Sequence, residues 1–300
     1  MSSHHGPSSE NLARLAARIP KGTWDTHMHC VDLEKFPAPK KDSPYKPSSH
    51  TIQEARDFLS KLGIEKMVIV QPSFYGNDYD CTLDGLQQIG SKNGRGVVQF
   101  DVDTTSEDQL RKWHDQGVRG VRLNYKSVGT KLESTSLAAQ LHKYAKAIRP
   151  FNWVMDLYIA MEDIPLLEPI VPELGDVKIC IAHFGHPSDA SISTAQSSEV
   201  MPGFASLIKL LKHDNFWVKV SGAYRLHRDP QHPLVKSIGR SVLRTRPDRC
   251  VFATDWPHTR FEDLDVTQYL QELFNWCEAE NVPIEQICVK NPEELFDAKS

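Results

Sequence analysis

The segment "GTWDTHMHCVD" at residues 22–32 carries an aspartate and two histidines at a spacing that suits chemistry better than packing. Successive residues of a β-strand point to opposite faces, so Asp25, His27 and His29 would share one face. Buried polar groups need partners, which makes two imidazoles and a carboxylate an unusual choice for a core. A hydrogen-bonded edge strand would account for them. A metal site or a proton-transfer site would also account for them, and the segment alone leaves these interpretations open.

Polar and ionisable side chains also stand near the ends of other short apolar runs. Runs at 23–29, 66–72, 95–101, 118–124, 152–158, 177–183, 216–222 and 250–255 alternate with helix-like stretches, several of which open on a Thr or Ser cap. Eight strands that alternate with helices indicate an α/β fold, a distorted (β/α)8 TIM-type barrel in a single domain, with an open doubly wound sheet as the alternative. Catalytic groups of such barrels lie at the carboxyl ends of the strands. The sequence therefore predicts one polar rim.

Residues 1–20 are expected to form an N-terminal tail and residues 21–300 the barrel. The composition then excludes several classes of protein. The net charge of −4 gives no electrostatic case for binding nucleic acid or an anionic membrane, and no apolar run approaches the roughly 18 residues of a membrane span. The six cysteines form no CxxC pair, which favours reduced thiols and a cytoplasmic location. The sequence does not indicate an oligomeric state.

Three motifs now point to a family. "DTHMH" at 25–29, "AHFGHP" at 182–187 and "ATDWPH" at 253–258 resemble the amidohydrolase superfamily. From about residue 20 onward, the chain is similar to the lactonase branch of that superfamily, and in particular to the 2-pyrone-4,6-dicarboxylate lactonases. The supporting segments are "SPYKP", "VQPSFYGND", "GVRGVRLN" and "KVSGAYRL". Their order along the chain and their positions at successive strand ends make the resemblance specific.

The resemblance leaves open whether the site holds a metal ion. In the superfamily, a single zinc would be held by the matching residues His27, His29, His183 and Asp255. Tyr158 stands where two-metal members carry a histidine, which speaks against a second ion. The resemblance to the 2-pyrone-4,6-dicarboxylate lactonases implies chemistry without a required metal, with the histidines donating hydrogen bonds to a carbonyl, whereas other relatives in this branch keep a zinc. The expected cofactor is therefore either none or one zinc.

The activity implied by the resemblance is hydrolysis of a lactone ring in a small, carboxylate-bearing substrate. Asp255 would act as the general base on water, while His27, His29 and His183 would polarise the carbonyl. His258 would orient Asp255 or contact the substrate. An alternative role for Asp255 is a helix N-cap after the eighth strand.

Arginines match the positions that hold carboxylates in this branch, and the planar guanidinium suits that task. The expected substrate-binding residues are Tyr45, Ser73, Arg119, Arg122, Tyr158 and Arg225. Arg119 and Arg122 differ in strand parity, so one of them would point away from the barrel interior unless the strand contains a bulge. Arg122 is the preferred site residue, and a structural ion pair is the alternative for either one.

Two rival functions remain at this point. One is a metal-dependent decarboxylase of an aromatic hydroxy acid, which would use a similar frame of histidines and aspartate. The other is a non-catalytic barrel that binds an anionic metabolite or a partner protein. The Asp255 carboxylate among three histidines favours an enzyme over a binding protein.

Overall fold

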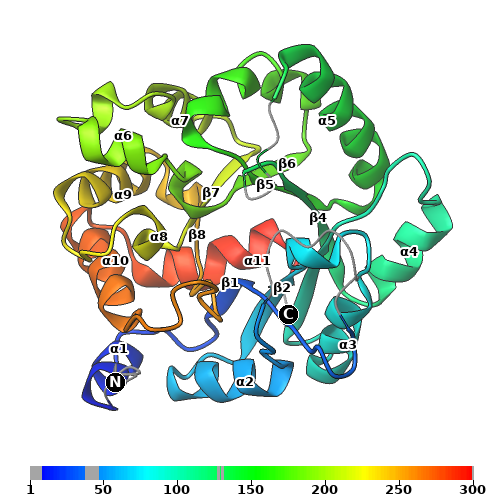
Figure 1. The fold of residues 1–300 in the computed structure, drawn as a ribbon, viewed down its shortest axis with the longest axis horizontal. Helices are drawn as coiled ribbons and strands as arrows, with labels where there is room; N and C mark the ends of the chain where they lie inside the picture. Colours follow the sequence, from blue (N-terminus) through cyan, green and yellow to red (C-terminus); the bar gives the residue numbers. More distant parts are fainter. Residues whose placement is uncertain (1–8, 38–46, 127–128, 130–131, 299–300) are drawn as a thin grey trace.

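A closed ring of parallel strands forms the centre of the protein and confirms the predicted TIM-type barrel. The computed structural model describes residues 9–37, 47–126, 129 and 132–298. Eight strands pair in chain order. They are β1 Trp24–Met28, β2 Lys66–Val70, β3 Gly94–Val98, β4 Val118–Asn124, β5 Val154–Tyr158, β6 Lys178–Ile181, β7 Phe216–Val220 and β8 Cys250–Phe252. Figure 1 shows them at the centre of a ring of helices.

Helices follow the strands and cover the outside of the barrel. They are α1 Ser9–Ala16, α2 Ile52–Lys61, α3 Asp80–Ile89, α4 Glu107–Asp115, α5 Ser134–Ile148, α6 Asp189–Thr194, α7 Phe204–Leu210, α8 Ala223–Leu226, α9 Pro233–Thr245, α10 Thr267–Ala279 and α11 Asn291–Leu295. Local sequence starts several of them. At α2, the Thr51 hydroxyl accepts from the Glu54 backbone at 3.3 Å while the Glu54 side chain accepts from the Thr51 backbone at 2.7 Å. This capping box satisfies amide groups that the first turn leaves without partners.

Hydrogen bonds join the first and last strands, both within the strands and just after them. The His29 amide donates to the Trp256 carbonyl at 2.8 Å, and the Asp255 amide donates to the His27 carbonyl at 3.0 Å. The Thr26 hydroxyl also donates to the carbonyl of Phe252 at 2.7 Å. These bonds close the barrel and hold the HxH segment directly beside the loop after β8.

Alternate residues of the strands fill the interior in two layers of different chemistry. The lower layer is apolar and is sealed by residues at and after the end of α11, which crosses the barrel in red in Figure 1. Its members are Trp24, Val68, Val70, Val97, Val154, Cys180, Trp217, Val251, Leu295, Phe296 and Ala298. Two residues further along, β5 and β7 present Asp156 and Lys219 instead. The strands thus carry a polar layer above a closed apolar floor.

Part of the N-terminal segment packs against the barrel. Residues 9–16 form helix α1, in which Leu15 is fully buried. Beyond it, the Arg18 guanidinium pairs with Glu278 at 2.9 Å and donates to the Gln271 carbonyl at 3.2 Å. These contacts with α10 attach the segment to the barrel.

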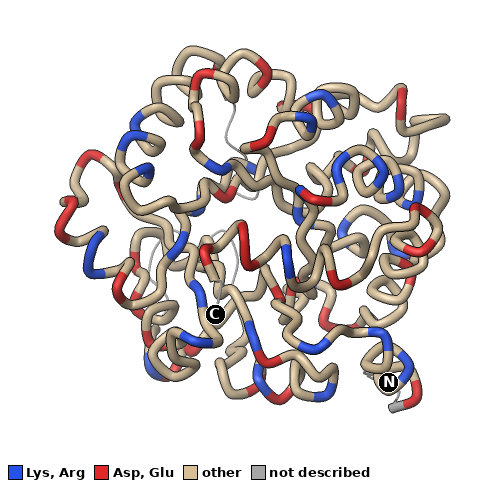
Figure 2. The backbone as a smooth tube through the Cα atoms, turned by 180° about the vertical axis from the view of Figure 1, so that it is seen from behind, with Lys and Arg blue, Asp and Glu red and all other residues tan. Residues whose placement is uncertain are grey.

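Charged residues of both signs are interspersed along the backbone in Figure 2. Among the described residues, every helix is too short or too polar to cross a bilayer.

Candidate active site

Three buried histidines surround one buried carboxylate at the carboxyl ends of the strands. The Nε2 atoms of His27 and His183 each lie 3.8 Å from Oδ1 of Asp255. The Nε2 atom of His29 lies 4.0 Å from the same oxygen. Within the described part of the chain, neither Nε2 of His27 nor Oδ1 of Asp255 has a hydrogen-bond partner. Four polar atoms therefore converge on a space that suits a substrate, a water molecule or an ion.

Unusual backbone conformations aim two of these side chains. The backbone is left-handed at His183, with φ 53°, and at Asp255, with φ 64°. Such conformations cost about 1–3 kcal/mol each in non-glycine residues and persist where the surroundings impose them. Gly222 permits the crowding, because a Cβ atom there would lie 2.7 Å from Nδ1 of His183 and 3.2 Å from Oδ2 of Asp255.

Each imidazole is held through its other nitrogen by a different kind of partner. Nδ1 of His29 lies 2.7 Å from the Val70 carbonyl, so this nitrogen donates. Nδ1 of His183 lies 3.0 Å from the Ser221 hydroxyl, which can donate or accept. Nδ1 of His27 lies 3.0 Å from the ammonium nitrogen of Lys219. The three rings are therefore fixed in orientation but are not chemically equivalent.

Asp255 is held as a carboxylate by two neighbours. Its Oδ2 accepts from the Tyr224 hydroxyl at 2.6 Å and from Nε of Arg225 at 2.5 Å. Burial alone would raise the pKa of the Asp255 carboxyl, but the Arg225 guanidinium holds that pKa below its ordinary value. Burial also lowers the pKa of His29 to about 3 and that of His183 to about 4. At neutral pH the site thus contains one carboxylate among neutral imidazoles.

The distances between the donor atoms suit a metal ion, but the hydrogen-bond partner of His27 does not. His27, His183 and Asp255 offer donor atoms that all lie within 4.8 Å of one another. Tetrahedral zinc with bonds of about 2.1 Å places its ligand atoms about 3.4 Å apart, so a small contraction would fit an ion. A metal-bound imidazole ordinarily donates its other N–H to an acceptor, whereas His27 has Lys219 there. The donor set therefore fails to fit zinc at His27.

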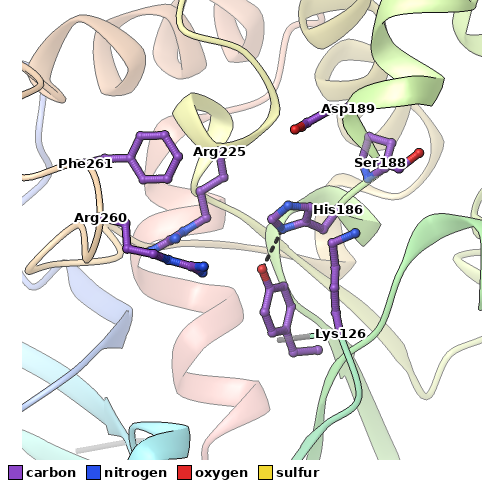
Figure 3. A pocket seen from close by; sticks show the side chains of 9 residues that line it. Lys126, His186, Ser188, Asp189, Arg225, Arg260 and Phe261 are labelled. Atoms are coloured by element: carbon purple, nitrogen blue, oxygen red, sulfur yellow. Dashed lines mark hydrogen bonds between the residues drawn. The ribbon is translucent and has the colours of Figure 1, made fainter. Parts of the chain in front are cut away.

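Two cavities that share lining residues lie beside the histidines. The inner cavity of ≈ 40 Å³ is lined by His29, Ser73, Arg122, Tyr158, His183, Arg225, Thr259 and Arg260. The outer cavity of ≈ 500 Å³ shares Tyr158, Arg225 and Arg260 with the inner one. Figure 3 shows Arg225 and Arg260 reaching into the outer cavity from one side, with His186 and Lys126 opposite. Tyr158 is fixed there by a 2.8 Å hydrogen bond to Nδ1 of His186.

Most of the predicted binding residues lie around the inner cavity. Ser73, Arg122, Tyr158 and Arg225 all line it, and the Arg122 guanidinium donates to the Gln71 carbonyl. Arg225 has a second task that the sequence did not indicate, because its Nε holds Asp255.

The outcomes for Arg119, Tyr45 and His258 differ. The placement of Arg119 in the site is wrong: it lies at the start of β4, beside a register shift, and donates to the carbonyls of His114 and Val118 at 2.8 Å. Tyr45 lies outside the described residues. His258 is buried, with its ring against Phe58 and Tyr224 at centroid distances of 5.6 and 5.7 Å. Tyr224 and Arg225, rather than His258, hold the Asp255 carboxylate.

The predicted set missed residues whose sequence signal is weak. Lys219 and Asp156 form a buried ion pair beneath His27. A lysine inside the apolar run "FWVKV" was the available signal for the first of them. Arg260 and Lys126 lie in loops and lack a strand position that would have pointed to the cavity.

Comparisons with known proteins identify the family of this chain. The chain is 29% identical over 297 residues to the 4-sulfomuconolactone hydrolase of Rhizobium radiobacter, covering 97% of this chain and 95% of that protein. It is 30% identical over 266 residues to the 2-pyrone-4,6-dicarboxylate hydrolase of Comamonas testosteroni, covering 84% of this chain and 82% of that protein. The crystal structure of a probable 2-pyrone-4,6-dicarboxylic acid hydrolase from Acinetobacter baumannii with citric acid bound superposes with a TM-score of 0.77 at 26% identity. That match covers 92% of this chain and 99% of the other. The profile of the amidohydrolase family matches residues 24–298, and the chain therefore belongs to that family.

Proposed function

We propose that this protein is a lactonase, which opens the ring of a small anionic lactone by hydrolysis. One observation carries the proposal: a buried carboxylate oxygen of Asp255 without a partner among the described residues faces three neutral imidazoles beside an arginine-lined cavity. The lactone hydrolases among the relatives support the same reaction class. The reduced, buried cysteines fit the expected cytoplasmic location.

The attacking water would be held by two acceptors. Nδ1 of His29 donates to the Val70 carbonyl, so Nε2 of neutral His29 carries a lone pair. Oδ1 of Asp255, 4.0 Å away, is the second acceptor. A water that donates one hydrogen to each of them directs its own lone pair toward a carbonyl carbon in the inner cavity. Such positioning contributes to catalysis before any proton moves.

One general acid–base group, Asp255, serves both the attack of water and the opening of the ring. As the water oxygen bonds to the carbonyl carbon, Asp255 takes the water proton, and His27 and His183 donate hydrogen bonds to the developing oxyanion. Collapse of the tetrahedral intermediate breaks the ring C–O bond. Asp255 returns the proton to the leaving oxygen, so the sum is lactone plus water giving an open-chain hydroxy or enol acid. Side chains of the protein carry every proton in this sequence.

The charges of the two cavities favour a substrate with two acidic groups. Arg122 and Ser73 line the inner cavity, where they would bind a carboxylate next to the reacting ring. Lys126 lines the outer cavity and Arg260 lines both cavities, so the outer cavity suits a second acidic group further from the carbonyl. The Acinetobacter baumannii protein binds citric acid, which, like a diacid lactone, carries more than one carboxylate. We therefore expect a diacid lactone such as 2-pyrone-4,6-dicarboxylate.

Ring opening over a panel of lactones, with and without a chelator, tests this function. Loss of the ring absorbance and release of acid from diacid lactones, unchanged by the chelator, is the expected result. Activity that a chelator abolishes and zinc restores would keep the lactonase assignment but overturn the donor role of the histidines. Release of CO2 from a hydroxybenzoate, with every lactone left intact, would overturn the assignment in favour of the decarboxylase.

A further inference from the structure

A fully buried lysine lies directly beneath the histidine cluster. Lys219 of β7 is 0% exposed, and its ammonium contacts two groups. It forms an ion pair with Oδ2 of Asp156 on β5, and it lies 3.0 Å from Nδ1 of His27. Asp156 is itself buried, with 1% of its surface exposed. The barrel interior thus encloses an ion pair, and the lysine of this pair contacts Nδ1 of His27.

This contact determines where His27 carries its proton. A lysine ammonium has three N–H donors and no acceptor, so Nδ1 of His27 must be the acceptor in the 3.0 Å contact. Neutral imidazole has one N–H, which then sits on Nε2. That atom is the one that faces Oδ1 of Asp255 across 3.8 Å.

The neighbouring His29 has the opposite arrangement. Its Nδ1 lies 2.7 Å from the Val70 carbonyl, which can only accept, so its proton is on Nδ1 and its Nε2 is bare. Two histidines two residues apart on one strand therefore present different atoms to the same space: a donor at His27 and an acceptor at His29. A metal ion requires bare nitrogens at both.

We infer that the Lys219–Asp156 pair is a positioning device that keeps His27 as an N–H donor to the lactone carbonyl and so excludes zinc from that nitrogen. Lys219 touches neither substrate nor reacting atoms and acts through His27. The pair with Asp156 holds the ammonium in place at low solvent exposure. This inference rests on the proposed lactonase function for its purpose, but the tautomer and the metal affinity can be measured without any substrate.

The first test uses the unaltered protein. Long-range 1H–15N correlation spectra of protein labelled with [15N]histidine report which ring nitrogen carries hydrogen, and His27→Gln identifies the His27 signals by their loss. The expected result is the Nε2–H form for His27 and the Nδ1–H form for His29. An Nδ1–H form at His27 would overturn the inference, whatever the enzyme hydrolyses.

The second test replaces the lysine with a space that water can occupy. In Lys219→Ala, a water can donate to Asp156 and accept from Nδ1–H of His27, which frees Nε2 as a ligand. Changes in such outer partners typically alter metal affinity 10–100-fold. Equilibrium dialysis against zinc should therefore show at least about tenfold tighter binding by Lys219→Ala than by the wild type.

Lys178→Ala is the matched control, because Lys178 is also a strand lysine but donates to the carbonyls of Glu294 and Leu295 at 3.2 and 3.1 Å. Its zinc affinity should equal that of the wild type. Equal zinc affinity in Lys219→Ala and Lys178→Ala, with both proteins folded by circular dichroism, would refute the role of Lys219. If Lys219→Ala does not fold, the spectrum of the wild type still decides.

Discussion

Replacing Arg225 by methionine should make the catalytic carboxylate a stronger base and move the acid limb of the pH–rate profile to higher pH. Arg225 contacts Oδ2 of Asp255 at 2.5 Å, and both side chains are buried. Two unit charges about 4 Å apart interact by about 4 kcal/mol at an effective dielectric constant of about 20. Since 1.36 kcal/mol corresponds to a factor of ten, loss of the guanidinium should raise the proton affinity of Asp255 about a thousandfold.

Two opposing effects set the pKa of Asp255 and determine the direction of the shift. Burial raises the pKa of Asp255 and Arg225 lowers it, so the arginine keeps the carboxylate ionised in the wild type. Without the arginine, burial outweighs the weaker lowering effects that remain, which come from the Tyr224 hydroxyl at 2.6 Å and from His183 and His29. The base then becomes protonated, and activity falls, at a higher pH than in the wild type.

The assay is kcat/KM for a diacid lactone between pH 4 and 9, with thermal unfolding to show that each variant is folded. Arg225→Lys is the matched control, since it keeps the charge but loses the planar fork. We expect its acid limb to stay near that of the wild type while its KM rises. An acid limb of Arg225→Met that coincides with the wild-type limb would refute the reasoning.

Three further predictions concern the base, the outer cavity and a buried acid. Asp255→Asn should lower kcat by about 10²–10⁴-fold through loss of the general base, whereas Asp189→Asn at the outer cavity should change it less than about threefold; more than a tenth of the wild-type kcat in Asp255→Asn would contradict the mechanism. Lys126→Met should raise KM about tenfold for a diacid lactone but not for a lactone with one carboxylate beside the ring, and equal increases for both would argue against the second subsite. Burial raises the pKa of Asp25 from 3.8 to about 6, so its stabilising contribution is complete below pH 3.8 and is lost as the pH rises through 6. Denaturant unfolding should then show about 3 kcal/mol less pH dependence over that range in Asp25→Asn than in the wild type, and parallel curves would contradict the shift.

The strand pattern could be predicted because each strand is a short apolar run with its own local signal. The predicted run 118–124 is β4 itself, while the run 177–183 is shortened to Lys178–Ile181 in β6. The difference arises because the backbone turns left-handed at His183, a conformation that a non-glycine sequence does not announce. Helix α1 depends on contacts with α10, more than 200 residues away in the chain, and such contacts leave no mark in a local window.

Site residues at the ends of strands could be predicted from the sequence. Residues whose position depends on a bulge, or that lie deeper in the barrel interior, could not. Parity separated Arg119 from Arg122, but only the register shift early in β4 shows which of them reaches the cavity. Lys219 looked like one polar residue in an apolar run. Its importance depends on two partners, His27 and Asp156, that come from other strands.

The apolar floor of the barrel has a consequence for how the protein is made. Phe296 and Trp24, from opposite ends of the described chain, belong to the same buried cluster. During synthesis the early strands emerge first, yet their inward-facing side chains lack this cover until residues 295–298 have been added. The barrel can therefore complete its interior only after the last strand and α11 have been translated, and until then the nascent chain exposes apolar surface of the kind that chaperones bind.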